Sequence, residues 1–131
     1  MRLDQKNKPN KPTMRALFNN PKHYLTLFSL AIFAVSYVML IEVKPVPQTW
    51  PIDKVQHAVI FAALTFLGLQ SFPRHWLKII FGLAVYGGLI ELLQTQLTLT
   101  RNGSVFDLLA DFSGLAFGFC LFKWINTYLN E

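Results

Sequence analysis

Eighteen consecutive residues, from Tyr24 to Ile41, carry no formal charge and are almost entirely apolar (YLTLFSLAIFAVSYVMLI). As a helix, a segment of this length approaches the ~20 residues needed to cross the hydrocarbon core of a bilayer. We exclude a secretory signal peptide, because the basic segment before it exceeds twenty residues and no small-x-small cleavage pattern follows. The segment is therefore interpreted as a retained membrane anchor.

Three further apolar segments follow, at about 55–72, 77–99 and 105–125. They are separated by connections rich in proline, glycine and charge (EVKPVPQTWP, SFPRHWLK and RNGS), with Pro51 suited to the first position of the second helix. A soluble helix would show one polar face, whereas these segments are apolar nearly all round. Charged residues make up 15% of the chain, against roughly 25% in soluble domains. The sequence thus predicts an all-α, polytopic membrane protein built as a four-helix transmembrane bundle.

The distribution of basic residues predicts how this bundle is oriented. Half of the twelve lysines and arginines precede the first apolar segment, and cytoplasmic connections carry such an excess. We therefore expect residues 1–22 to form a basic cytoplasmic tail, residues 23–126 to form the transmembrane domain, and both termini to be cytoplasmic. Loops 42–53 and 100–104 would then lie on the outer face of the membrane. The basic tail is explained by topology and lipid headgroups, so the phospholipid bilayer is the expected partner and nucleic acid is not.

Polar residues are confined to particular turns of these apolar segments. Ionisable groups at membrane depth are costly, so they should face the bundle interior and pair with one another. With a rise of about 1.5 Å per residue, three helices present such groups at a similar level. We expect Asp53 in the first turn of its helix, His57 turned toward Glu91 and Asp107, and a capping box formed by Ser104 and Asp107. The candidate site residues are Asp53, Lys54, His57, Glu91, Gln94, Arg101, Ser104, Asp107 and Asp111.

Ordinary structural roles explain several of these residues when each is taken alone. Interfacial solvation or helix capping suffices for Asp53, Lys54 and Arg101, and an interhelical hydrogen bond suffices for Glu91. The glycines are interpreted as helix-packing positions, with GLAFG at 114–118 matching a small-xxx-small pattern. The single cysteine, Cys120, excludes an intramolecular disulfide and a thiolate metal cluster. The glycines interpreted as helix-packing positions are Gly82, Gly87, Gly88, Gly114 and Gly118.

Two segments carry a family resemblance: DKVQHAVIFAALTFLGL and, after it, GLIELLQTQLTLTRNGSVFDLLADFSGLAFG. Together they resemble the VanZ-like family of small bacterial membrane proteins. The family pattern is D-K-x-x-H, then E-x-x-Q, then R-x-x-S-x-x-D-l-x-x-N-x-x-G, and the resemblance covers roughly residues 50–118. One position departs, because Asp111 stands where the pattern has asparagine. The resemblance implies an envelope protein, and the family's namesake is associated with resistance to the glycopeptide teicoplanin. The matching positions are Asp53, Lys54, His57, Glu91, Gln94, Arg101, Ser104, Asp107 and Gly114.

Three functions fit these residues. The first is an accessory or binding protein whose outer-face cluster takes a lipid headgroup, a lipid-linked cell-wall precursor or another membrane protein, with Arg101 and Lys54 able to hold a phosphate. The second is an intramembrane, Mg²⁺- or Mn²⁺-assisted hydrolase of lipid phosphates, using His57, Glu91 and Asp107. The third is a small ion-coupled transporter using Glu91 and Asp111. We favour the first, with no cofactor or metal, because no nucleophile and no complete set of metal ligands is evident.

Overall fold

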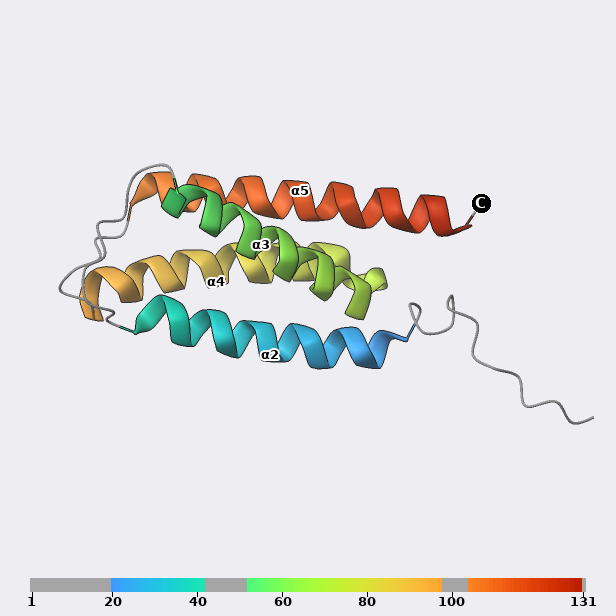
Figure 1. Cartoon of the computed structure of the whole chain (residues 1–131), viewed down its shortest axis with the longest axis horizontal. Coiled ribbons are helices and arrows are strands. Elements are labelled where there is room, and N and C mark those ends of the chain that lie inside the picture. Colours follow the sequence, from blue (N-terminus) through green and yellow to red (C-terminus); the bar gives the residue numbers. More distant parts are fainter. Residues whose placement is uncertain (1–19, 42–51, 98–103, 131) are drawn as a thin grey trace, which may run out of the picture.

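The computed structural model describes residues 20–41, 52–97 and 104–130, with side chains up to Tyr128. Within these ranges the chain forms four long helices and one short 3₁₀ helix, as Figure 1 shows. Each long helix is long and apolar enough to cross a membrane, which confirms the predicted all-α, four-span fold class. The elements are α2 (Pro21–Leu40), α3 (Ile52–Ser71), η1 (Pro73–His75), α4 (Trp76–Leu97) and α5 (Val105–Asn130).

Helix α2 begins three residues before the predicted span because Asn20 caps it. The Asn20 side chain accepts a hydrogen bond from the Lys22 backbone N–H at 3.1 Å, and Pro21 occupies the first helical position. The predicted turn at 71–78 is also shorter in the structure, because α4 already begins at Trp76. Asp53 lies in the first turn of α3 as expected, whereas Pro51 lies outside the described residues.

Helix α3 lies at the centre of the bundle and contacts each of the other three long helices. Its closest partner is α5, whereas α2 and α5 have no direct contact within the described residues. The helices run side by side, so the beginnings of α3 and α5 and the ends of α2 and α4 share one end of the bundle (Figure 1). This arrangement brings together residues that are far apart in the sequence.

The close approach of α3 and α5 depends on two glycines. A Cβ atom at Gly114 would overlap the carbonyl oxygen of Ala58, and one at Gly118 would lie 2.5 Å from the carbonyl oxygen of Ala62. The predicted close packing at GLAFG is thereby confirmed. The same interpretation is wrong for Gly82 and Gly88, where an added Cβ would meet no atom within 4 Å.

The rest of the bundle is mostly apolar, both inside and on its outer surface. Phe61, Leu64, Leu83 and Leu115 form the buried core between α3, α4 and α5. Large apolar side chains also cover the outer surface; Phe33 and Phe81, for example, are 75% and 72% exposed. A soluble protein rarely presents such a surface, whereas the hydrocarbon of a bilayer covers it without cost. The polar residues at one end stand out against this background.

Candidate functional site

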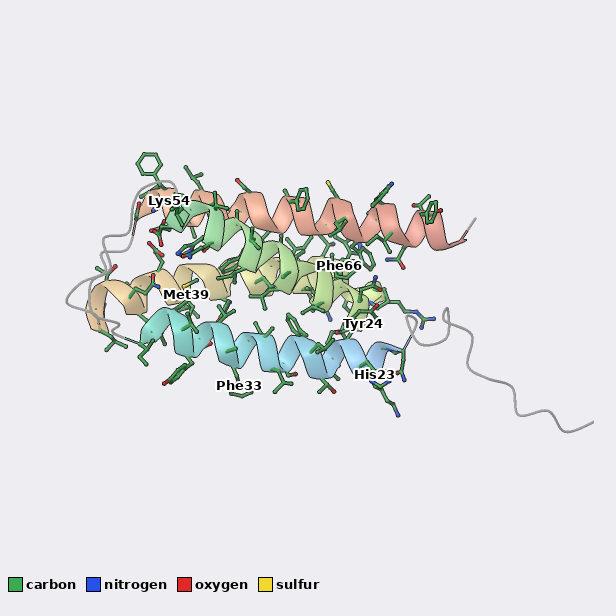
Figure 2. All side chains as sticks on the ribbon, viewed as in Figure 1. His23, Tyr24, Phe33, Met39, Lys54 and Phe66 are labelled. Carbon is green, nitrogen blue, oxygen red and sulfur yellow. The ribbon has the colours of Figure 1, made fainter. Side chains whose placement is uncertain are left out.

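Polar side chains from three helices meet where α3 and α5 begin and α4 ends. Figure 2 shows Lys54 and Met39 at this end of the bundle and His23 and Phe66 at the opposite end. We call the group the polar cluster. His57, Asp107 and Asp111 are buried within it, and each lies inside a membrane-spanning helix. Its members are Asp53, Lys54, His57, Glu91, Ser104, Asp107 and Asp111.

Lys54 forms a bridge between α3 and α5. Its Nζ donates to Asp107 Oδ1 and, at 3.2 Å, to Asp53 Oδ2. The Asp107 carboxylate therefore pairs with Lys54 instead of forming the expected capping box with Ser104. The ammonium of Lys54, which the sequence offered as a phosphate holder, already has two carboxylate partners. Among the described residues, Lys54 therefore holds the members of the cluster together.

One turn deeper, His57 pairs with Asp111. The His57 Nδ1 atom lies 2.9 Å from Asp111 Oδ1, and both side chains are only 4% exposed. The expected partners of His57 were Glu91 and Asp107, so its hydrogen bond goes to a different residue. The two α3–α5 pairs follow helical spacing, because His57 lies about one turn beyond Lys54 and Asp111 one turn beyond Asp107. Gly87 of α4 makes room for the pair, since a Cβ there would lie 3.0 Å from Asp111 Oδ2.

Glu91 joins α4 to the start of α5. Its Oε1 atom accepts a hydrogen bond from the Ser104 backbone N–H, while the Ser104 hydroxyl accepts from the Phe106 backbone N–H at 3.2 Å. Glu91 thus does what the acid of a capping box does, but from another helix. Its second oxygen, Oε2, is buried and has no hydrogen-bond partner among the described residues. Glu91 is also close enough to Asp107 and His57 to interact with them electrostatically.

One predicted site residue, Gln94, lies outside the cluster, and another is not described. Gln94 is buried, and its Nε2 donates to the carbonyl oxygen of Met39 at 3.0 Å, so it joins α4 to α2. Arg101 lies outside the described residues. A second α2–α4 contact, in which the hydroxyls of Ser36 and Tyr86 lie 2.8 Å apart, was not predicted. The sequence does not indicate this contact, because an isolated serine or tyrosine within an apolar segment does not show which residue it pairs with.

The cluster offers oxygen and nitrogen atoms of the kind that bind cations, rather than a nucleophile hydrogen-bonded to a base. Donor atoms of Asp53, His57 and Asp107 lie within 4.8 Å of one another, an arrangement that can hold a cation. In the part of the chain that the structure describes, the hydrogen bond of His57 goes to Asp111 and no hydroxyl or thiol is bonded to it. General-base activation of a serine or cysteine has no support in this geometry.

An apolar groove lies between α3 and α5, the two helices that supply most of the polar cluster. It has a volume of about 380 Å³ and an almost wholly apolar lining. Ala58, in its wall, follows His57 in the sequence, and Ser113 lies two residues after Asp111. The groove therefore lies along the same two helices, at a level that begins next to the His57–Asp111 pair. Its lining residues are Ala58, Val59, Ala62, Ser113, Gly114 and Phe117.

Together these features define a small multi-pass helical membrane protein with a buried polar cluster at one end. A sequence model of the VanZ/LLP1 family matches residues 3–126, so the chain belongs to that family. The resemblance found in the DKVQH, ELLQ and RNGSVFD segments is thereby confirmed. No curated protein and no solved structure matches the chain significantly.

Proposed function

We propose that this protein is an accessory protein of the bacterial cell envelope that binds a lipid or a lipid-linked ligand. The headgroup rests on the polar cluster, and one acyl chain lies in the groove between α3 and α5. The observation that carries the proposal is that α3 and α5 form both the groove and most of the polar cluster, at neighbouring levels of the bundle. Polar groups close to an apolar groove suit the amphipathic shape of a membrane lipid.

The surroundings of the groove favour an acyl chain as its occupant. The groove lies within two membrane-spanning helices, where the bilayer supplies hydrocarbon at high concentration. It is hollowed by small residues, Ala58, Ala62 and Gly114, whereas neighbouring positions such as Val59 and Phe117 present bulky side chains to lipid. A hollow of this kind holds a flexible chain better than the convex surface of a helix does.

Filling the groove should release the bound lipid. Ser113 is exposed, so a Ser113→Trp substitution places an indole in the groove while leaving the α3–α5 glycine contact in place. We expect retention of a phospholipid by the purified protein to fall about tenfold, which corresponds to about 1.4 kcal/mol. Native mass spectrometry of protein released from nanodiscs of bacterial phosphatidylethanolamine and phosphatidylglycerol measures the bound lipid per chain.

The matched control is Ser29→Trp, which changes an exposed serine of α2 outside the groove. It should retain lipid as the unchanged protein does. Equal retention by both tryptophan variants would contradict binding in the groove. A loss of lipid from both would indicate that tryptophan disturbs annular lipid in general.

The proposal includes an orientation, with both termini cytoplasmic and the polar cluster at the outer face of the cytoplasmic membrane. It is supported by the six basic residues among residues 1–22, ahead of the apolar part of α2. On a Cys120→Ser background, single cysteines at Pro47 and Asn102 should react with a membrane-impermeant thiol reagent in intact cells, whereas one at His75 should not. The reverse pattern would place the cluster in the cytosol and exclude extracytoplasmic ligands.

A lipid-linked cell-wall precursor is the ligand that would connect this site to glycopeptide sensitivity. Such a precursor combines a long hydrocarbon chain with a large headgroup, as the groove and the cluster require. The connection to teicoplanin is part of the proposal and rests on the family alone. The hydrolase and the transporter gain no comparable support from the described residues.

A further inference from the structure

The end of the bundle opposite the polar cluster, where α2 and α4 begin, is basic (Figure 1). All four acidic residues that the structure describes belong to the polar cluster at the other end. Four of the five described lysines and arginines lie at the basic end, and none of the four forms a salt bridge within the described residues. These four residues are Lys22, Arg74, Lys78 and Lys123.

Two of these cations lie on one exposed face where η1 passes directly into α4. Arg74 and Lys78 are four residues apart, so helical spacing makes their side chains neighbours. Both side chains are exposed, and like charges at this spacing repel each other. His75, which follows Arg74, is exposed as well. An anion between Arg74 and Lys78 would replace their repulsion with two attractive contacts.

The same face of α4 continues into the membrane span as an apolar surface. Phe81 and Val85 follow Lys78 by about one and two helical turns, and both are exposed. Gly82 lies beside them, and a Cβ atom added there would meet no atom within 4 Å, so the surface is open at this level. A cationic end that passes into lipid-facing apolar surface fits the charge and shape of a phospholipid with a net negative charge.

We propose that this face of η1 and α4 binds an anionic phospholipid of the adjacent leaflet. Its phosphate lies between Arg74 and Lys78, and one acyl chain lies along Phe81 and Val85. The guanidinium of Arg74 can bond two phosphate oxygens at once, while Lys78 supplies a compact point charge. The inference goes beyond the proposed function, because it concerns a second lipid at the other end of the bundle and uses none of the groove residues.

The test compares two phospholipids on the full chain in nanodiscs that contain equal amounts of phosphatidylglycerol and phosphatidylethanolamine. Native mass spectrometry counts the lipid of each kind that stays on the released protein. The unchanged protein should retain phosphatidylglycerol over phosphatidylethanolamine by about tenfold. Arg74→Gln and Lys78→Gln should each lower this preference about threefold, because each removes one of the two phosphate contacts.

Lys123→Gln is the matched control, because Lys123 is an exposed lysine at the same end of the bundle but on another side of α4. Its Nζ atom lies 5.7 Å from the centroid of the Phe119 ring, and that ring packs against Trp76. Trp76 is two residues from Lys78, which puts the two side chains on nearly opposite faces of the helix. Lys123→Gln should therefore lower the lipid preference much less than Lys78→Gln does.

Equal retention of the two lipids by the unchanged protein would overturn the proposal, and this result does not depend on how any variant folds. An equal loss of preference in Lys123→Gln and Lys78→Gln would also overturn it, because it would indicate general attraction of anionic lipid to this end. Displacement of phosphatidylglycerol by inorganic phosphate would point to a soluble ligand instead. Ser113→Trp should keep the preference for phosphatidylglycerol, so failure of the groove experiment and failure here are distinguishable.

Discussion

Replacing Asp111 with alanine is expected to destabilise the bundle by about 3 kcal/mol. The substitution leaves His57 buried without its hydrogen-bond partner, and removing one member of a buried pair is costly because the other remains desolvated. It also opens space beside Gly87, where an added Cβ would lie 3.0 Å from Asp111 Oδ2. Titration with sodium dodecyl sulfate in mixed micelles, followed by circular dichroism, measures the loss in unfolding free energy.

Asp111→Asn is the informative companion, because it keeps a side-chain oxygen at the position that His57 contacts. We expect it to cost about 1 kcal/mol or less, in line with a hydrogen bond that is retained but no longer charge-assisted. The family pattern has asparagine at this position, which agrees with that expectation. Equal losses in the two variants would show that the negative charge, rather than the hydrogen bond, stabilises the bundle. No loss in either would mean that the pair does not stabilise the bundle.

The second large effect is expected at the contact between α3 and α5. Gly114→Ala adds a methyl group that overlaps the carbonyl oxygen of Ala58, a backbone atom that moves only if the helices separate. Overpacking of this kind costs about 1–3 kcal/mol, and we expect the upper end because the neighbour cannot rotate away. The same detergent titration measures the loss in unfolding free energy.

Gly88→Ala provides the control, because it adds the same methyl group in the middle of α4 where no atom lies within 4 Å. It should leave stability unchanged or raise it by up to about 1 kcal/mol, as alanine favours helix more than glycine does. Comparable losses at Gly88 and Gly114 would mean that glycine flexibility, rather than close contact, matters in these helices.

The fold could be predicted from the sequence because one physical requirement dominates it. A backbone that crosses hydrocarbon must satisfy its own hydrogen bonds, so each long apolar segment becomes a helix. The prolines in EVKPVPQTWP and SFPRHWLK then separate the spans. The boundaries were less predictable, since the start of α2 depended on the side chain of Asn20.

The composition of the polar cluster could be predicted, but its pairing could not. Spacing along one helix shows that Asp53 and His57 share a face, and likewise Asp107 and Asp111. It does not show how deep one helix sits relative to another, and that offset decides whether His57 meets Asp107 or Asp111. Glycine contacts such as Gly114 against Ala58 set the offset, and they form only in the assembled bundle.

The pairing of Lys54 and His57 with α5 also bears on how the protein is made. Their partners Asp107 and Asp111 lie 53 and 54 residues further along the chain, so α3 leaves the ribosome long before either exists. Until α5 arrives, α3 holds a lysine and a histidine at membrane depth without those carboxylates. We therefore expect the start of α3 to stay at the headgroup level until α5 is made. The arrival of α5 supplies the two carboxylates and lets this turn of α3 pack into the bundle.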